Sequence, residues 1–229
     1  QLQPAAQAGA PPQLLPRPMP PAKHARRANI SRDELILTTT EGVRSVALTN
    51  LDSGEWDRFL PARDGWGQTS PDGQWLAYRY HYSKSVRVYQ LPELKPINQV
   101  IASNYVYSAT FSPDRQEMIV VHRDGADWWD TATWERKREY TGAPIPGSYV
   151  FYTPDGSGLW TVIHFRQVGL HDRRTLEPLL LLPAETAPVA VSPDGQSVAV
   201  SIHRRRMQIW KLPELRREFR RLGIDWERR

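Results

Sequence analysis

Four histidines recur at almost constant spacing, and imidazole is the side chain most suited to metal binding or proton transfer near neutral pH. Each follows the start of a repeated four-residue motif by 10 or 11 residues; they are His81, His122, His164 and His203. Ligands of one zinc ion must each lie about 2.0–2.1 Å from it, whereas equivalent positions of separate repeats stand much further apart. We therefore predict no metal site. Two alternatives remain: exposed loop imidazoles, or a partner surface that responds to pH near ~6.5.

The repeated motif carries an aspartate, which raises the idea of a ring of carboxylates. Its copies are Ser70-Pro71-Asp72-Gly73, Ser112-Pro113-Asp114-Arg115, Thr153-Pro154-Asp155-Gly156 and Ser192-Pro193-Asp194-Gly195, with Ser31-Arg32-Asp33-Glu34 as a degenerate copy. In such a tetrad the hydroxyl satisfies a nearby backbone amide, proline presets φ, aspartate bonds locally and glycine tolerates positive φ. We therefore predict that the aspartates cap tight turns between two strands.

Other catalytic arrangements are missing from the sequence. The chain has no cysteine, which excludes disulfides, thiolate metal sites and thiolate nucleophiles. It has no Gly-x-Ser-x-Gly, no His-Glu-x-x-His and no phosphate-binding Walker loop. The sequence therefore predicts no catalytic residue and no cofactor.

The elements that carry these side chains repeat every 40 residues or so. The tetrads start 42, 41 and 39 residues apart, and a second marker keeps a similar spacing from Asn50-Leu51 to Lys211-Leu212. Each unit contains short segments that read as strands; those of the third unit are 105–111, 118–121, 127–129 and 136–140. Four strands per period of about 40 residues are the signature of a β-propeller blade. We predict an all-β fold, a β-propeller of about five recognisable four-stranded blades.

The tetrads, the strand ending at Trp129-Asp130 and the ending Gln208–Leu212 of the fifth unit make residues 31–212 resemble WD40-repeat propellers. The tetrad is shared with TolB-like propellers, so this assignment rests on the Trp-Asp remnants. Only one unit has Trp-Asp and no Gly-His dipeptide occurs. The buried Asp–His–Ser/Thr–Trp network of the family therefore cannot form in its usual way.

The end of the chain, 212–227, is similar to the terminus of bacterial WD40 domains in multidomain proteins, often downstream of a Hanks-type serine/threonine kinase. The sequence has no Gly-rich phosphate loop, His-Arg-Asp or Asp-Phe-Gly motif. Any kinase would therefore lie outside this chain. The resemblance implies an interaction domain of a larger protein.

We divide the chain into a tail (1–22), the propeller (23–212) and a basic C-terminal segment (213–229). The tail holds seven prolines, typical of a linker. After Trp210 no outer strand follows, and Gln13–Pro16 resembles the ends of outer strands. Because an open edge strand invites aggregation, we expect the tail to supply that strand and close a five-bladed ring; an open arc is the alternative.

Residues 213–222 read as a helix, with Pro213 in its first turn and Gly223 as its terminator. Leu215, Phe219 and Leu222 form one apolar stripe, which we expect to pack on the fifth blade. The alternative is a solvated, frayed tail.

The net charge of +5 is concentrated at the ends. Residues 1–30 carry four basic and no acidic residues and 203–229 carry ten basic and four acidic, which leaves sixteen basic against twenty-one acidic in 31–202. Nucleic-acid-binding domains usually place basic residues on the folded body, so nucleic acid is not the favoured partner. No apolar run approaches the roughly 18 residues of a membrane helix, and we predict no membrane insertion.

Loops displayed by a rigid scaffold are where such folds carry function, and aromatic anchors dominate binding energy. We therefore predict partner binding at the ends of the second strands and the starts of the inner strands. The candidate residues are Trp66, Tyr80, His81, Tyr82, Tyr105, His122, Tyr149 and His164. Alternatively, Trp66, Tyr105 and Tyr149 fill the central channel.

Together these patterns predict a non-enzymatic β-propeller scaffold that binds another protein or another domain of its parent chain. Two alternatives belong to other classes: a propeller hydrolase or lyase with a channel-mouth site, and a nucleic-acid binder that uses the basic termini. The compartment is not fixed; the cytoplasm is favoured, and an extracytoplasmic place would follow if a membrane helix preceded Gln1.

Overall fold

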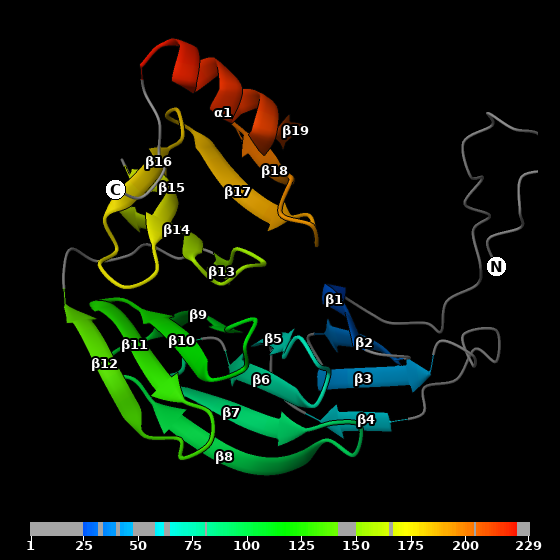
Figure 1. Cartoon of the computed structure of the whole chain (residues 1–229). Helices are drawn as coiled ribbons and strands as arrows, with labels where there is room; N and C mark the ends of the chain where they lie inside the picture. Colours follow the sequence, from blue (N-terminus) through cyan, green and yellow to red (C-terminus); the bar gives the residue numbers. More distant parts are fainter. Residues whose placement is uncertain are drawn as a thin grey trace, which may run out of the picture.

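The computed structural model describes residues 25–31, 34–39, 42–47, 58–61, 65–80, 82–141, 150–164, 167–203 and 205–223. They form five antiparallel sheets that follow one another around an arc, and one helix (Figure 1). Four sheets have four strands and the fifth has three. The predicted all-β propeller is confirmed, but with four complete blades and one that lacks its outer strand among the described residues.

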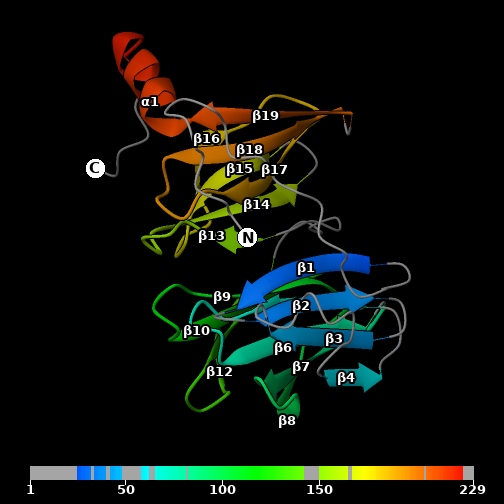
Figure 2. The same cartoon turned by 90° about the vertical axis from the view of Figure 1, so that its right-hand side faces the viewer.

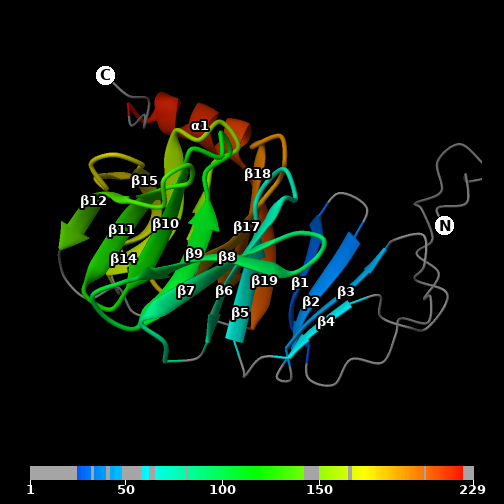
Figure 3. The same ribbon diagram turned by 90° about the horizontal axis from the view of Figure 1, so that it is seen from below.

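Within each sheet the strands are adjacent in the order in which they occur in the chain. The first sheet contains β1 (Ala25–Ser31), β2 (Glu34–Thr39), β3 (Gly42–Ala47) and β4 (Arg58–Pro61). The second contains β5 (Gly65–Thr69), β6 (Trp75–Tyr80), β7 (Ser85–Gln90) and β8 (Lys95–Ile101). In Figure 3 the strands of the first sheet run side by side at one end of the molecule.

The remaining three sheets have the same order. The third contains β9 (Val106–Phe111), β10 (Glu117–His122), β11 (Gly125–Asp130) and β12 (Arg136–Thr141). The fourth contains β13 (Phe151–Tyr152), β14 (Gly158–His164), β15 (Gln167–Asp172) and β16 (Pro178–Leu181). The fifth contains β17 (Thr186–Val191), β18 (Ser197–Ile202) and β19 (Arg206–Lys211), and α1 (Leu212–Arg221) follows it directly.

The first four sheets pack on one another through their first strands, β1 on β5, β5 on β9 and β9 on β13. The fourth sheet packs on the fifth through its two central strands, since β14 and β15 contact β17. Between the described residues of the fifth and first sheets there is no comparable packing. Figure 2 looks at the side of the arc where these two sheets lie. The predicted closing strand from the tail falls outside the described residues.

Four apolar clusters fill the four interfaces between successive sheets. The strand β10 shows how one element serves two of them. Met118 and Val120 belong to the cluster shared with the second sheet, whereas Ile119 and Val121 belong to the cluster shared with the fourth. Because side chains alternate along a strand, a strand between two neighbouring sheets must be apolar on both faces, which is the pattern in the sequence.

The tetrads form the predicted turns. Ser112 donates to the carboxylate of Asp114 at 2.5 Å, and the same carboxylate accepts the backbone N–H of Gln116 at 3.0 Å. The other three clear copies repeat both bonds. The fourth residue is left-handed each time, with φ of 68° at Gly73 and 62° at Arg115. The interpretation of the aspartates as turn caps is confirmed.

The helix α1 begins one residue before the predicted segment, and Gly223, at φ 72°, follows its end. Leu215 and Phe219 pack against the cluster between the fourth and fifth sheets, as predicted. Leu222 does not, since it is 70% exposed. The helix stops at Arg221, and Leu222 is the residue that caps its C-terminal end. No helix in the described part of the chain is long and apolar enough to cross a membrane.

Candidate functional site

The structure brings two of the predicted partner-binding residues together. The rings of Tyr82 and Tyr105 meet edge to face, with centroids 6.1 Å apart and planes at 74°. Tyr82 is 73% exposed and Tyr105 is 40% exposed. We call this pair the Tyr82–Tyr105 patch. It joins the second sheet to the third at the ends of the sheets opposite the tetrad turns.

Backbone hydrogen bonds hold the loop of Tyr82, between β6 and β7, against the loop between β8 and β9. The N–H of Ala102 donates to the carbonyl of Lys84, and the N–H of Val106 donates to the carbonyl of Ser83, both at 2.8 Å. Ser83 Oγ also accepts the N–H of Ser85 at 2.9 Å. Tyr82 has φ 57°, which turns the chain tightly. The patch is therefore built on a preformed backbone.

A third loop, between β10 and β11, supports Tyr105 from the other side. The N–H of Arg123 donates to the carbonyl of Tyr105 at 3.0 Å, and the side-chain amide of Asn104 donates to Asp124 at 2.9 Å. Asn104 Oδ1 in turn accepts the N–H of Tyr105 at 2.8 Å. The patch thus has an aromatic centre and a polar surround, an arrangement typical of protein interfaces.

His122 lies beneath these loops, and its predicted exposure is wrong because it is only 4% exposed. Nδ1 accepts the N–H of Asp124 at 3.3 Å and lies 3.3 Å from Ser103 Oγ. Nε2 lies 3.4 Å from a carboxylate oxygen of the buried Asp127, within ion-pair range. Arg136 approaches the other oxygen of that carboxylate at 3.5 Å. The imidazole contacts the loop before β9, the loop after β10 and the strand β11, and its burial leaves it unavailable to a partner.

Trp66 and Tyr80 are half-buried and contact arginines of their own sheet. The guanidinium of Arg79 lies 5.6 Å from the ring centroid of Trp66. Tyr80 meets Tyr78 edge to face at 5.4 Å, and its hydroxyl accepts from Arg87 at 3.2 Å. These contacts assign them a packing role in the second sheet.

The other predicted residues are less fully placed. His81 and Tyr149 lie outside the described residues, and His164 is described only as the last residue of β14. The exposed His203 pairs through Nδ1 with Glu185. No three histidine, aspartate or glutamate side chains gather as a metal site in the ranges that the structure describes.

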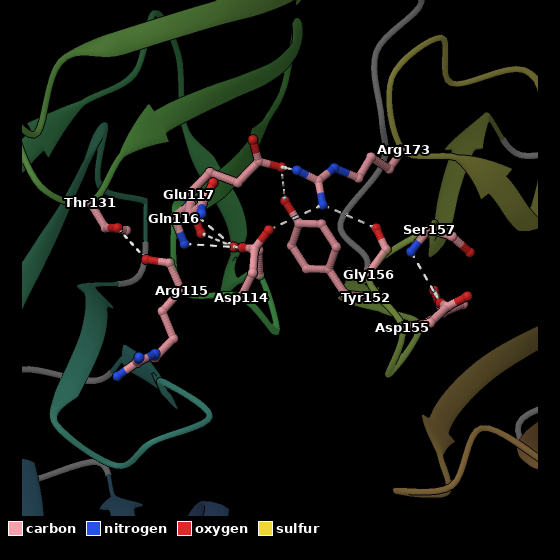
Figure 4. Close-up of polar contacts among 12 residues, drawn as sticks. Asp114, Arg115, Gln116, Glu117, Thr131, Tyr152, Asp155, Gly156, Ser157 and Arg173 are labelled. Atoms are coloured by element: carbon pink, nitrogen blue, oxygen red, sulfur yellow. Dashed lines mark hydrogen bonds and ion pairs between the residues drawn. The ribbon is translucent and has the colours of Figure 1, made fainter.

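The opposite ends of the sheets carry a polar network that ties the third sheet to the fourth (Figure 4). Arg173, from the turn between β15 and β16, lies 3.3 Å from Glu117 and 3.6 Å from Asp114. Tyr152 donates to Glu117 at 3.0 Å; burial, with the neighbouring Glu117, raises the pKa of this phenol, so it stays protonated as the donor. This network links the third blade to the fourth.

A second inter-blade contact places a cation on a buried ring. The guanidinium of Arg138, in β12, lies 3.7 Å from the ring centroid of Trp128 and donates to the carbonyls of Arg174 and Arg173 at 2.6 and 2.9 Å. Sequence reasoning missed this residue. In the sequence Arg138 stands among other polar residues of an outer strand. That pattern is the same for an arginine that packs on a buried ring and for one that is fully solvated.

The tetrad ends also carry a groove of about 1010 Å³ between α1 and the turns of the fourth and fifth sheets. Its lining includes Leu170, Leu179 and Leu212, together with arginines of α1 and residues of the tetrads that begin at Thr153 and Ser192. The sequence predicted both the basic C-terminal segment and the tetrad turns, but not that they line the same groove.

Comparison with solved structures shows the fold. The chain is similar to the β-propeller domain of Cps50 (Swd1) from Myceliophteria thermophila, with a TM-score of 0.67 and 16% identity over 83% of this chain and 66% of that one. It is also similar to Kuenenia stuttgartiensis hydrazine synthase, with a TM-score of 0.60 and 20% identity over 82% of this chain and 57% of that one. The chain thus spans less than two thirds of either. No family model and no curated protein sequence matches it.

These likenesses and the five antiparallel sheets show that the chain has a β-propeller fold. The resemblance expected from the tetrads and the Trp-Asp remnant is therefore confirmed at the level of the fold.

Proposed function

We propose that this chain is a non-enzymatic scaffold that binds another protein, or another domain of its parent chain, through the Tyr82–Tyr105 patch. The observation that carries the proposal is the exposure of two touching tyrosine rings on loops tied together by backbone hydrogen bonds. Tyrosine offers a large contact area with few rotatable bonds, so little entropy is lost when a partner covers it. A preformed backbone lowers the cost of binding further.

The parent in this proposal is a larger bacterial multidomain protein. Support comes from the similarity of the C-terminal segment, 212–227, to that of bacterial WD40 domains in multidomain proteins. In such a setting the patch serves either an intramolecular or an intermolecular contact, and both use the same surface.

The test is capture of a partner by the parent protein carrying Tyr82→Ser and Tyr105→Ser. Loss of two central aromatic anchors should weaken capture at least about tenfold, because each truncation of such a residue commonly costs ~2 kcal/mol. The matched control is Met207→Ser with Ile209→Ser, which removes two exposed apolar side chains from the fifth sheet. Melting curves confirm that both variants stay folded.

Full capture by the tyrosine variant, or equal loss in the control, would refute the assignment of this surface. Turnover by the unmodified chain in a panel of ester and glycoside substrates would contradict the non-enzymatic role.

A further inference from the structure

The backbone groups that build the Tyr82–Tyr105 patch are engaged with each other. Its loops are joined by the backbone pairs Ala102–Lys84, Val106–Ser83 and Arg123–Tyr105. A partner that adds a strand needs an open sheet edge, and an amphipathic helix needs a groove with anchor sites over several turns. Two exposed, touching rings suit a third mode better, in which a proline-rich segment packs its rings on aromatic side chains. The patch therefore has the features of a proline-recognition surface.

Charge does not select the occupant of this surface. Lys84, Arg123 and Asp124 are exposed on two of its three loops, so charges of both signs surround the rings. Asp124 already accepts a hydrogen bond from Asn104. Contact with the rings must therefore supply the selectivity. Because proline has no backbone N–H, a run of prolines brings few donors that this surface would have to satisfy.

The chain itself contains a segment of this kind. Residues 11–21 hold six prolines, and four of these stand within the six residues 16–21. Proline fixes φ close to its value in the polyproline II helix, so such a segment loses little entropy when it binds. Residues 1–24 lie outside the described part of the chain, which begins with β1 at Ala25.

The start of β1 lies at the same end of the sheets as the patch. β1 ends at Ser31, which pairs with Glu34 at the tetrad turn, so Ala25 is at the opposite end, as is Tyr105 just before β9. β1 packs on β5 and β5 on β9. At about 10 Å per packed sheet, Ala25 lies roughly 20 Å from the start of β9. A polyproline II segment rises ~3.1 Å per residue, so about seven residues cover this distance and bring Pro16–Pro21 to the patch.

We infer that the Tyr82–Tyr105 patch is a proline-recognition surface and that the proline-rich segment 11–21 of the same chain occupies it. The inference rests on the proposed function, because both concern the same surface, and it means that a partner competes with the tail. The closing strand expected from Gln13–Pro16 would instead place this segment beside β19. Proline cannot donate to a sheet ladder, which favours the patch for Pro16–Pro21.

The test measures fluorescence anisotropy of a labelled peptide, with the sequence of residues 10–22, against full-length chains. A tail variant carries Pro16→Ser, Pro18→Ser, Pro20→Ser and Pro21→Ser. It should bind the peptide at least about threefold more tightly than the unmodified chain, because a tethered tail competes at an effective concentration on the order of millimolar. Adding Tyr82→Ser and Tyr105→Ser to the tail variant should weaken binding at least about tenfold.

Two controls decide the chemistry and the place. A peptide with alanine at the same four proline positions keeps the charge and should bind at least about tenfold more weakly. Adding Met207→Ser and Ile209→Ser to the tail variant removes exposed apolar side chains of β19 and should leave binding unchanged. Melting curves check that each variant is folded, and the comparison of the two peptides needs no variant.

The inference is overturned if the peptide does not bind, if the alanine peptide binds equally, if the β19 substitutions weaken binding as much as the tyrosine substitutions, or if the tail variant binds no more tightly than the unmodified chain. Dimers of the unmodified chain that the tail variant does not form would assign the segment to a second copy and also overturn it. Because no partner is present, a chain that captures a partner but not the peptide would leave the proposed function standing. Peptide binding together with full partner capture by the tyrosine variant would refute the proposed function alone.

Discussion

The third and fifth sheets share their turn chemistry and differ in what covers them. Ser112 and Ser192 make the same bond to the tetrad aspartate, at 2.5 Å in both turns. The N–H of each serine also donates to the carbonyl five residues on, at 2.9 and 2.8 Å. Yet β10 is almost entirely buried, whereas β18, the corresponding strand of the fifth sheet, has only two buried residues. Local chemistry therefore makes the hairpin in both sheets but does not determine its burial.

The difference follows from the number of neighbours. The third sheet lies between the second and the fourth, and both of its faces enter apolar clusters. The fifth sheet has the fourth on one face, with α1 extending the same cluster. Among the described residues its other face has no sheet packed on it, and Met207 and Ile209 stand exposed there. A blade in this fold depends on its neighbours for most of its stabilisation.

The largest expected effect tests this dependence directly. Ile119→Ala, in β10, should lower the free energy of unfolding by about 2–5 kcal/mol because it leaves a cavity in a packed interface. Ile119 is 1% exposed, whereas Ile209 on β19 is 60% exposed. Ile209→Ala should therefore change stability by less than ~0.5 kcal/mol. Urea denaturation of both variants gives the comparison, and similar losses would show that the fifth sheet is covered as well as the third.

The free energy of unfolding should also depend on pH, because the fourth sheet contains a buried histidine. His171, in β15, is fully buried and lies opposite Leu159, a member of the cluster between the third and fourth sheets. Burial lowers the pKa of His171 to about 4, and the backbone of Gly169 and Leu159 offsets this only in part. Above pH ~6.5 both folded and unfolded chains hold a neutral imidazole. As the pH falls toward 4, only the unfolded chain takes up the proton, so about 3 kcal/mol of stability should be lost.

His171→Leu isolates this contribution. The difference in unfolding free energy between the variant and the unmodified chain should change with pH between about 6.5 and 4 and be constant above that range. A constant difference throughout would mean that the imidazole is accessible to protons in the folded state.

Truncating a side chain of α1, which packs beside the fifth sheet, should have an intermediate effect on stability. Phe219→Ala removes a half-buried ring from the cluster and should cost about 1–2 kcal/mol, less than full burial of a phenylalanine is worth. Amide exchange across 212–223 should become faster. Leu222→Ala, at an exposed position of the same segment, is the matched control and should leave exchange unchanged. Equal exchange in the two variants would mean that the ring does not hold the helix.

The smallest effect concerns the fourth tetrad residue, which is Arg115 in the third sheet and Gly195 in the fifth. Arg115 adopts φ 62° and pairs with Asp72 across the sheet boundary at 2.8 Å. Arg115→Gly relieves the left-handed strain, worth about 1 kcal/mol, but loses an exposed ion pair worth up to ~1 kcal/mol. The net change should be close to zero. Arg115→Ala keeps the strain without the pair and should be less stable than Arg115→Gly by ~1 kcal/mol in thermal unfolding; equal stabilities would contradict the strain.

Sequence reasoning succeeded where interactions are local. The tetrad turns need contacts within five residues, and the helix needs Pro213, Gly223 and a periodic stripe, so both could be read from the chain. It failed where burial comes from a distant segment. The distant segment that covers His122 is the loop between β8 and β9, whose Ser103 lies 19 residues earlier in the chain, and no spacing rule shows that contact.

The same limit applies to the two candidate surfaces. Tyr82 and Tyr105 were expected on one face, but their ring contact depends on loops of two different sheets. The groove joins α1 to Asp155, which lies more than fifty residues earlier in the chain. Such contacts follow from how the sheets are stacked, and stacking depends on the whole core.

The tetrad turns also touch one another from sheet to sheet. A methyl group placed at Gly156 would lie 3.6 Å from Cδ of Pro113, and one at Gly195 would lie 3.5 Å from Cδ of Pro154. These are ordinary van der Waals distances, so each of these glycines fits against the proline of the turn before it without excess space. Arg115 holds the same position in the third sheet and reaches Asp72 of the preceding turn at 2.8 Å. The fourth residue of these turns therefore meets the turn before it whether it is a glycine or an arginine, and successive turns form a continuous row along one edge of the arc.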